Sequence, residues 1–260
     1  MCILIPCYNN LQGLIKSLQT IKYDEGKYLI LIVDDGSENA FDVNDLFINN
    51  NPLPVHVIRL NENRGITIAL NTGMQWIKEN IICAYIARLD CGDTCDSRRF
   101  YLQMEYLSVN PDIALLGCWC YFQEPGKNFK IKYKSPALHK QIKRTMYFRN
   151  AFIHPTVIFR FDIVEKLGFY PSEYPYAEDY ALFWKIINSA QTAILPLYLV
   201  VCELNGSGIS FTNRIKQLQS RLVVVKNFGH TFVLKILGIF KIEILKKVPY
   251  SFIVFVKKLI

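Results

Sequence analysis

The 260-residue sequence lacks both of the glycine-rich loops that commonly hold nucleotide phosphates. No Gly-x-Gly-x-x-Gly follows the first apolar segment, and no Gly-Lys-Ser/Thr triplet occurs in the chain. These absences exclude a dinucleotide-binding fingerprint and a P-loop. A nucleotide bound by this chain must therefore be held by other side chains and by a metal ion.

Long apolar runs and paired metal-binding cysteines are also missing. No uninterrupted apolar run reaches the roughly 18 to 20 residues that a membrane span needs. The pairs Cys91/Cys95 and Cys118/Cys120 have no second pair at zinc-ribbon spacing, which disfavours structural zinc. We expect no signal peptide ahead of the first apolar segment, and we therefore expect the eight cysteines to be reduced, cytosolic and mostly buried.

Acidic residues are scarce at the C-terminal end of the chain. From Arg214 onward there are 10 Lys+Arg against the single acid Glu243, whereas residues 1–213 carry 20 Lys+Arg and 21 Asp+Glu. The near-neutral body argues against a nucleic-acid groove. The basic end predicts an appendage that meets an anionic surface.

The segment 214–260 alternates lysines with apolar residues, which allows two interpretations. The favoured one is a basic amphipathic helical region that lies on an anionic membrane surface, peripheral at the inner face of the plasma membrane. The other is a pair of C-terminal helices packed on the body, with a solvated lysine face.

Short apolar segments and helical segments alternate along the first part of the chain. With 51% hydrophobic and 20% charged residues, the chain can bury a sizeable core. Near-continuous apolar strands joined by helices predict an α/β fold with a mostly parallel central sheet flanked by helices. The expected strands are 2–5, 28–33, 55–58 and 81–86, and the expected helices are 11–21, capped by Asn9 or Asn10, and one that starts at Ile66.

The second part of the chain predicts further elements of both kinds. A helix contains Phe100 and Leu107, and 113–118 is an apolar strand. The stretch 123–135 predicts a turn between two short strands. The segment 152–159 predicts a strand that His154-Pro155 interrupts, at an edge or a bulge.

Polar side chains follow the predicted strands where the strands end. Tyr8, Asp34, Asp35 and Arg64 follow the first three, and the carboxyl ends of parallel strands meet at the crevice where such sheets bind ligands. An aromatic face, two carboxylates and a cation can hold a base, a ribose and a diphosphate.

Two aspartates follow the strand predicted at 81–86. Asp90 and Asp93 supply anionic oxygens of the kind that Mg²⁺ or Mn²⁺ prefers. The alternative interpretation is a loop whose aspartates only cap turns.

Three residues of the second part could carry chemistry. Glu178 and Asp179 open a predicted helix, where acidic residues are favoured by the helix dipole, and one of them could instead be a general base. His154 is more readily explained as a structural histidine than as a ligand.

Six motifs in this order give the chain a family resemblance. They are Ile5-Pro6-Cys7-Tyr8-Asn9, Val33-Asp34-Asp35-Gly36-Ser37, Asn61-Glu62-Asn63-Arg64-Gly65 with Ala69-Leu70-Asn71-Thr72-Gly73, Ala87-Arg88-Leu89-Asp90-Cys91-Gly92-Asp93, His154-Pro155-Thr156-Val157 and Glu178-Asp179-Tyr180. Over roughly residues 2 to 190, the sequence resembles the family 2 inverting glycosyltransferases with the GT-A (Rossmann-like) fold, in particular bacterial enzymes that build surface polysaccharide or lipopolysaccharide.

The resemblance implies a nucleotide-diphosphate sugar as donor, with uridine diphosphate the family's commonest carrier. The implied nucleotide-binding residues are Pro6, Tyr8, Asp34, Asp35, Arg64 and Asp90. By the same resemblance, Tyr8 would pack on the base, and Asp35, with Asp34 beside it, would hydrogen-bond base or ribose.

The resemblance also implies a metal and a base. The loop with Asp90 and Asp93 would hold a divalent cation, Mn²⁺ or Mg²⁺, on the diphosphate. Asp179, with Glu178 beside it, would take the proton of the acceptor hydroxyl as this attacks the anomeric carbon. The chain departs from the family at Gly92, where an aspartate that binds the metal usually stands.

The implied organisation has three parts. Residues 1–213 form the catalytic domain, with nucleotide-sugar binding in about 1–95 and the acceptor side in about 96–213, and 214–260 is the basic helical extension. The implied acceptor is a glycan or a lipid-linked saccharide in the cytoplasm, and no nucleic acid is bound. The alternatives are a nucleotidyltransferase, whose phosphate loop is missing here, and a sugar-nucleotide-binding module without catalysis.

Overall fold

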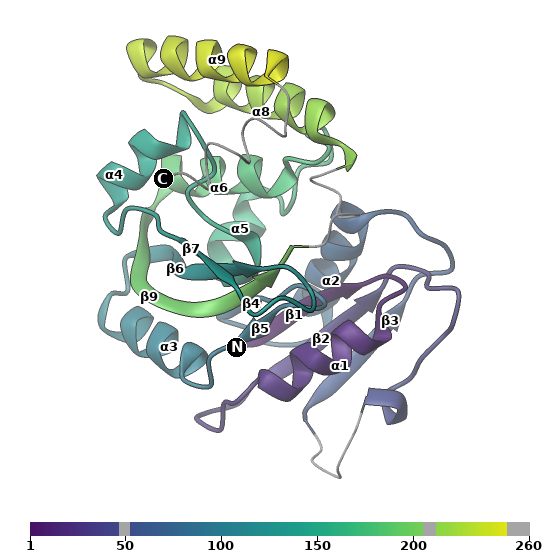
Figure 1. The fold of residues 1–260 in the computed structure, drawn as a ribbon. Coiled ribbons are helices and arrows are strands. Elements are labelled where there is room, and N and C mark those ends of the chain that lie inside the picture. The colour runs from purple at the N-terminus through teal and green to yellow at the C-terminus, as the bar shows by residue number, and fades with distance from the viewer. Residues whose placement is uncertain (47–52, 205–211, 249–260) are drawn as a thin grey trace.

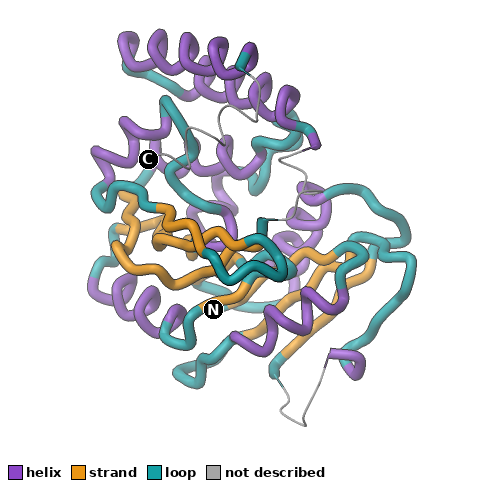
Figure 2. The backbone as a smooth tube through the Cα atoms, viewed as in Figure 1, coloured by secondary structure: helices purple, strands orange, loops and turns teal. Residues whose placement is uncertain are grey.

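A central sheet with helices on both faces organises the chain (Figures 1 and 2). The computed structural model describes residues 1–46, 53–204 and 212–248. The strands are β1 Cys2–Cys7, β2 Leu29–Asp34, β3 Val55–Arg59, β4 Tyr85–Arg88, β5 Thr94–Cys95, β6 Ile113–Gln123, β7 Lys130–Tyr133, β8 Ile158–Arg160 and β9 Gln191–Glu203. The α-helices are α1 Leu11–Thr20, α2 Ile66–Asn80, α3 Arg99–Val109, α4 His139–Met146, α5 Phe161–Leu167, α6 Glu178–Ser189, α8 Arg214–Phe228 and α9 Phe232–Lys247, and short 3-10 turns are η1 Asn44–Leu46 and η2 His154–Thr156.

The order of the strands creates a topological switch point between β1 and β4. The order is β3-β2-β1-β4-β8-β6-β9-β5, and β7 pairs with β6. Strands β3, β2, β1 and β4 are parallel, whereas β8 runs antiparallel to both β4 and β6. The chain winds from β1 to β2 and β3 on one side and returns to β4 on the other side. In open α/β sheets, ligands bind outside the carboxyl ends of the strands at such a switch point.

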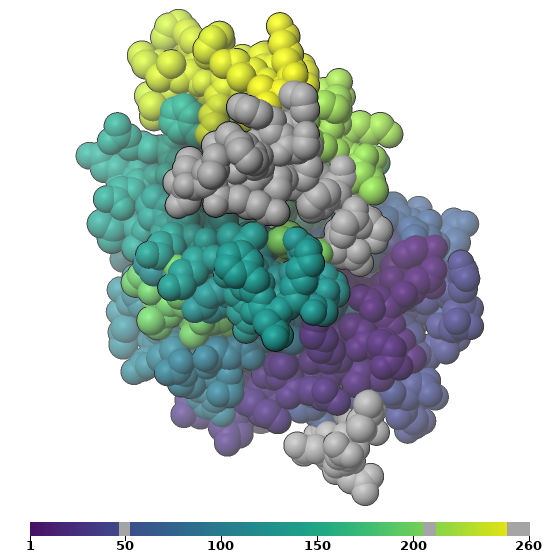
Figure 3. Space-filling model, in the orientation of Figure 1, coloured from purple at the N-terminus to yellow at the C-terminus, as the bar shows by residue number. Residues whose placement is uncertain are grey.

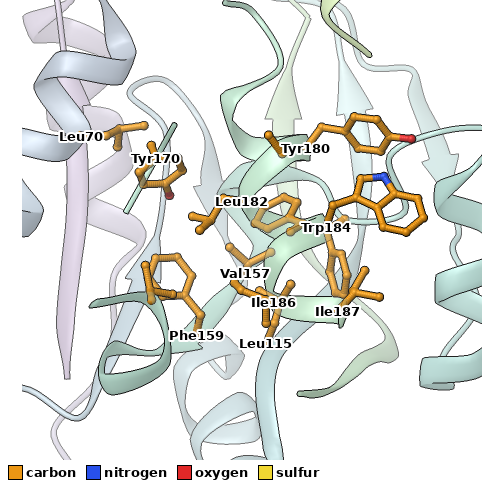
Figure 4. Packing of buried hydrophobic residues seen from close by; sticks show 14 of the residues in the cluster. Leu70, Leu115, Val157, Phe159, Tyr170, Tyr180, Leu182, Trp184, Ile186 and Ile187 are labelled. Carbon is orange, nitrogen blue, oxygen red and sulfur yellow. The ribbon is translucent and has the colours of Figure 1, made fainter. Parts of the chain in front are cut away.

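Alternating residues of the buried strands feed two hydrophobic clusters, one on each face of the sheet. In β1, Cys2 and Leu4 belong to the cluster that contains α2 and α6, while Ile3 and Ile5 belong to the cluster that contains α1 and α3. Figure 4 shows the first cluster, in which Trp184 of α6 is fully buried. Fully burying each large apolar side chain stabilises the fold by about 1.5–3 kcal/mol.

Most of the predicted elements are confirmed, with small shifts of their ends. The helix predicted at 11–21 is α1, and Asn10 is its cap, since its side-chain oxygen accepts the Gly13 N–H at 3.0 Å. The turn predicted within 123–135 joins β6 to β7.

The strand predicted at 81–86 is wrong over its first four residues. The Ile81 N–H still bonds to the carbonyl of Ile77 in α2, and Ile82 is fully exposed, at 108% of its reference area. The strand begins only at Tyr85, and it extends to Arg88.

The strand predicted at 152–159 is confirmed only at Ile158 and Phe159. The interruption predicted at His154-Pro155 is confirmed, but it is a 3-10 turn beside a strand inside the sheet, and not an edge or a bulge. Residues His154–Thr156 form a 3-10 turn closed by the Thr156 N–H on the Ile153 carbonyl, and β8 starts at Ile158. Proline cannot donate to a strand ladder, so Pro155 suits the first turn of a 3-10 helix better than a strand.

Helices α8 and α9 pack on the body as a pair (Figure 1). Leu218, Val224 and Val225 of α8 and Ile242 of α9 are buried in the cluster that also contains α6. Residues 249–260, which belong to the segment predicted as a membrane anchor, lie outside the described residues. Within the described part of the chain, no helix combines the length and the apolar character that a bilayer crossing requires.

The turn after β2 gives a first prediction. Gly36 and Gly26 have nearly the same left-handed φ, +70° and +73°, so an alanine costs about 1–2 kcal/mol of backbone strain at either position. At Gly36 the added Cβ would also lie 2.3 Å from the Glu62 carbonyl carbon, whereas the described residues place no atom within 4 Å of a Cβ at Gly26. We expect Gly36→Ala to lower the unfolding free energy by about 1–3 kcal/mol more than Gly26→Ala, measured by urea denaturation. Equal losses would contradict the close contact between the two loops.

Candidate functional site

The ends of β1, β2 and β4 lie together at one edge of the sheet. The Asp35 N–H donates to the Cys7 carbonyl at 2.8 Å, which joins the loop after β2 to the end of β1. The Cys7 and Cys91 sulfur atoms are 3.5 Å apart, which joins the end of β1 to the loop after β4. The polar loops predicted to gather at this edge therefore do so.

Asp34 and Asp35 hold neighbouring loops in place. The buried Asp34 carboxylate accepts the Ser37 N–H at 3.0 Å and pairs with the Arg59 guanidinium at 2.8 Å. The Asp35 carboxylate accepts the N–H groups of Arg64 and Gly65, each at 2.9 Å. Asp34 is fully buried and both of its oxygens are bonded, so it acts by positioning this loop. Asp35 is 4% exposed, and each of its oxygens can accept a second hydrogen bond.

Three other predicted nucleotide-binding residues lie around these loops. Tyr8 is 44% exposed and follows β1 directly, so its ring is free to stack on a planar ligand. The Arg64 side chain is exposed, and Pro6 is half-buried within β1. Asn9 ties this region to the β2 loop, since its side chain accepts the Glu38 N–H at 2.8 Å.

Arg88 is a site residue that the sequence reasoning missed. It is fully buried in β4, and its guanidinium donates to Asp90 at 2.6 Å, to His154 Nε2 at 3.3 Å and to the Leu4 carbonyl. Arg99, also fully buried, donates to the Arg88 carbonyl at 2.8 Å. A charge inside an otherwise apolar strand is the signal that could have identified Arg88, because a buried charge needs partners.

The loop that carries Asp90 and Asp93 concentrates negative charge. Burial raises the pKa of Asp90, and the charges of Arg88 and Arg99 oppose this shift. Burial and the charge of Asp90 raise the pKa of Asp93 well above its usual range. Gly92 between them has a φ of +102°, a backbone conformation that glycine adopts readily.

Asp90 and Asp93 could supply part of the ligands of a divalent cation, with oxygens of the substrate supplying the rest. Among the described residues, no group of three or more His, Cys, Asp or Glu side chains forms a complete metal site. Mg²⁺ is usually held by one or two carboxylates together with substrate phosphates, which Asp90 and Asp93 can satisfy. A third carboxylate, that of Glu203, lies 3.8 Å from where a Cβ on Gly92 would be, and it also pairs with Lys16 at 2.8 Å.

Asp179 and Glu178 lie at the start of α6, and they differ in how many hydrogen bonds their carboxylates accept. The Asp179 carboxylate accepts the Asn150 side-chain N–H at 2.9 Å and the Tyr180 N–H at 2.6 Å. Glu178 is 7% exposed, and its Oε2 has no hydrogen-bond partner within the ranges that the structure describes. Burial raises the pKa of Asp179 to about 6, and burial together with the charge of Asp179 raises the pKa of Glu178 to about 7.

The loop after β4 and the start of α6 form one electrostatic site. The charge of Asp90 contributes to the raised pKa values of both Asp179 and Glu178, although 88 residues separate Glu178 from Asp90 in the sequence. The same three carboxylates contribute to the raised pKa of Tyr170. The charge of the candidate metal loop therefore acts on the candidate base.

His154 connects these two regions as a neutral acceptor. Its Nε2 lies 3.3 Å from the donating Arg88 Nε and 2.8 Å from the Tyr170 hydroxyl. Burial and the charge of Arg88 hold the pKa of His154 well below its usual range. These contacts agree with the interpretation of His154 as a structural histidine.

Comparison with solved structures shows the fold. The chain superposes on Staphylococcus aureus TarS 1–349 with a TM-score of 0.66 and 16% identity, over 93% of this chain and 69% of that one. It also superposes on the mannosyltransferase PcManGT of Pyrobaculum calidifontis, solved with GDP-Man and Mn²⁺, with a TM-score of 0.59 and 16% identity, over 87% of this chain and 63% of that one. The fold is therefore GT-A-like, as the sequence predicted.

Comparison with family profiles and with characterised relatives shows the family of this chain. The profile described as glycosyl transferase family 2 matches residues 2–168. The amylovoran biosynthesis glycosyltransferase AmsE of Erwinia amylovora is 33% identical over 196 residues, which are 72% of this chain and 69% of the relative. The UDP-Gal:alpha-D-GlcNAc-diphosphoundecaprenol beta-1,3-galactosyltransferase of Escherichia coli is 29% identical over 178 residues, 67% of this chain and 60% of the relative. The chain belongs to glycosyl transferase family 2 and is a nucleotide-sugar-dependent glycosyltransferase.

The ion pair between the fully buried Arg88 and the partly exposed Asp90 gives a second prediction. Arg88→Met would leave Asp90 and the buried Leu4 carbonyl without their donor, and a buried acceptor left without a partner costs about 1–3 kcal/mol. We expect this loss of unfolding free energy in urea denaturation. The matched control is Arg98→Met, which breaks the exposed Arg98–Asp96 pair and should leave stability unchanged within error. Similar stabilities for the two variants would show that Arg88 does not organise the site.

Proposed function

We propose that this enzyme transfers a sugar from a nucleoside-diphosphate sugar to an acceptor hydroxyl with inversion at the anomeric carbon. The observation that supports this most is the series of hydrogen bonds that joins Asp90 to Arg88, Arg88 to His154 and His154 to Tyr170. The charge of Asp90 also contributes to the raised pKa of Asp179. In this proposal, a carboxylate suited to a diphosphate-bound cation acts near one suited to deprotonate an alcohol. One displacement assisted by one base inverts the anomeric centre, and no second carboxylate is needed as a nucleophile.

The donor side consists of the loops after β1, β2 and β3. Tyr8 packs on the base. Asp35, with Asp34 beside it, hydrogen-bonds base or ribose, and Arg64 lies near the nucleotide. Pro6 supports this loop from within β1. We propose a UDP-sugar as the donor. TarS has also been solved in complex with UDP-GlcNAc, at a TM-score of 0.66 and 16% identity over 92% of this chain, and this supports UDP as the carrier.

A divalent cation, Mn²⁺ or Mg²⁺, is part of the proposed donor site. Asp90 and Asp93 would hold it, and Gly92 leaves them without the additional aspartate of related enzymes. When bound, the cation offsets the negative charge that develops on the leaving diphosphate. Arg88 keeps the Asp90 carboxylate in position for this role.

Asp179 is the proposed general base, and its neighbour Glu178 assists. With a pKa of about 6, Asp179 is mainly ionised near pH 7, whereas Glu178, with a pKa of about 7, is protonated about half of the time. The ionised Asp179 accepts the proton of the attacking hydroxyl, and positioned bases of this kind typically contribute about 10² to 10⁴ in rate.

We propose a glycan or lipid-linked saccharide as acceptor, in surface polysaccharide or lipopolysaccharide synthesis. The Escherichia coli relative is named for a diphosphoundecaprenol-linked acceptor, and AmsE is named for amylovoran biosynthesis. The location proposed from the sequence is the cytoplasm, peripheral at the inner face of the plasma membrane. In this proposal, residues 1–213 are the catalytic part and 214–260 the surface-binding part.

Replacing the proposed base gives a third prediction. Asp179→Asn removes the proton acceptor but keeps the donor loops, so we expect sugar transfer to fall by about 10² to 10⁴ while the donor still raises the melting temperature. The matched control is Asp162→Asn, since Asp162 is also an acidic residue in the first turn of a helix, α5, and it is partly exposed. We expect this control to transfer at the wild-type rate. Unchanged transfer by Asp179→Asn would refute the role of Asp179 as general base. If the wild type binds the donor but never transfers a sugar, the alternative of a sugar-nucleotide-binding module without catalysis is favoured.

The pH dependence of transfer gives a fourth prediction. The base acts when it is ionised, so kcat should be constant above about pH 6 and fall about tenfold per pH unit below it. The charge of Arg221 on α8 lowers the pKa of Asp179, so Arg221→Gln should move the falling limb to higher pH. Lys226→Gln, an exposed change on the same helix, should leave the limb in place. An identical limb in the wild type and Arg221→Gln would exclude Asp179 as the titrating group.

A further inference from the structure

Helix α9 lies at the surface of the molecule (yellow in Figure 3), and the rest of the described chain does not cover its apolar outer face. Six of its side chains are between 45% and 74% exposed, and they are Phe232, Val233, Ile236, Leu237, Phe240 and Ile244. At 100° per residue these six lie within one half of the helix circumference, opposite the buried Gly238 and Ile242. We call these six side chains the α9 apolar face. A helix of a water-soluble protein normally turns its polar side outward, so this one is arranged for contact with an apolar phase.

A basic cleft adjoins the first turn of this helix. It encloses about 740 Å³ between α4 and α9, and we call it the α4 cleft. Its lining includes Lys140, Lys143 and Arg144 of α4 and Thr231 and Leu234 of the α9 start. No acidic residue lies among the described residues that line the cleft, and the sequence of α4 contains none. The cleft is therefore suited to anionic groups such as phosphates.

The cleft and the apolar face are held rigidly to the body of the enzyme. The Tyr147 hydroxyl accepts the Thr231 N–H at 2.9 Å, and the Tyr147 ring packs against Trp184 of α6 at 5.0 Å between ring centroids. Gly238 lets α9 approach closely, because a Cβ there would lie 2.3 Å from the Tyr147 carbonyl oxygen. The surface is thus connected through packed groups to the helix that carries Asp179.

We propose that the α9 apolar face and the α4 cleft together bind the surface of an anionic phospholipid bilayer. The apolar side chains insert at the boundary between headgroups and acyl chains, and the α4 cleft receives lipid phosphates. This proposal deepens the membrane location given above, since it assigns that role to described residues and adds α4, which the sequence did not indicate. Binding itself requires neither donor nor acceptor, so it can be tested apart from the proposed transferase chemistry.

Charge complementarity favours a bilayer over a protein partner. The α4 cleft offers three cationic side chains near the first turn of the helix that carries the apolar face, and a membrane surface likewise offers anionic headgroups next to acyl chains. On α9 the only acid is Glu243, which pairs with Lys246 at 3.0 Å, and Lys247 is exposed near the end of the helix. A 16-residue helix is about 24 Å long, so it suits lying along a membrane rather than crossing it.

The test is sedimentation of the full chain with vesicles of phosphatidylcholine containing about one-third phosphatidylglycerol. The full chain is needed because α8 buries Leu218, Val224 and Val225 in the core, so truncation at Asn213 would expose that core. We expect the wild type to bind these vesicles and not vesicles of phosphatidylcholine alone. Absence of binding to the anionic vesicles would overturn the proposal.

Matched pairs of variants locate the surface. Phe232→Gln/Phe240→Gln changes the apolar face, and its control is Ile82→Gln/Val109→Gln, two other exposed apolar residues. We expect the first pair to lower the partition coefficient roughly tenfold or more and the control to leave it unchanged. If the control lowers the partition coefficient as much as the test variant does, the α9 apolar face is not the docking surface.

The charges are tested in the same way. Lys140→Gln/Arg144→Gln removes two exposed charges of the α4 cleft, and its control, Lys22→Gln/Lys27→Gln, removes two exposed charges near the end of α1. We expect the partition coefficient onto anionic vesicles to fall roughly tenfold for the cleft variant and to stay unchanged for its control. Equal losses in both variants would mean that net charge, and not the cleft, drives binding. A lipid-free dimer that the phenylalanine changes abolish would show a second copy of the chain on this face and would also refute the proposal.

Discussion

The buried guanidinium of Arg88 is the interaction on which the site depends. A charge without water costs several kcal/mol unless each of its donors finds an acceptor, and Arg88 meets this need by bonding to three separate segments. The Leu4 carbonyl belongs to β1, Asp90 to the loop after β4, and His154 to the 3-10 turn. Because the guanidinium is planar and rigid, it sets the relative positions of all three acceptors. Burying Arg88 therefore makes its three hydrogen bonds necessary, and these bonds fix the three segments of the site relative to one another.

The parallel half of the sheet could be predicted from the sequence. The strands predicted at 81–86 and 152–159 were largely wrong, and the reason is physical. The runs that form β1, β2 and β3 are apolar and bounded by polar turns, so pattern and structure agree. At β4 and at the His154 turn, buried polar side chains belong to the site, and a reading based on hydrophobicity treats such residues as surface. The predicted strand therefore included Ile82, which is exposed, and excluded Arg88, which is buried.

The candidate site was predicted as a set of residues but not as a set of interactions. The gathering of the loops after the strands follows from parallel topology alone, which is why Asp35 and Asp90 could be placed at one edge. Topology does not reveal that Asp35 already holds the N–H groups of Arg64 and Gly65, nor that Asp90 acts on the pKa of Glu178. Such contacts depend on side-chain positions across long separations in the sequence, and they require the folded structure.

The proposed base lies outside the part of the chain that the family profile matches. The profile ends at residue 168, whereas Asp179 opens α6 and Arg221, whose charge lowers the pKa of Asp179, comes from α8. The Arg221 guanidinium also lies 5.3 Å from the centre of the Tyr180 ring, so α8 contacts the residue next to the base. Helices α6 and α8 thus carry the proposed base and one of the charges that act on it. Because α8 packs against both α6 and α9, any change in how α8 packs on α6 affects both the proposed base and the position of the α9 apolar face.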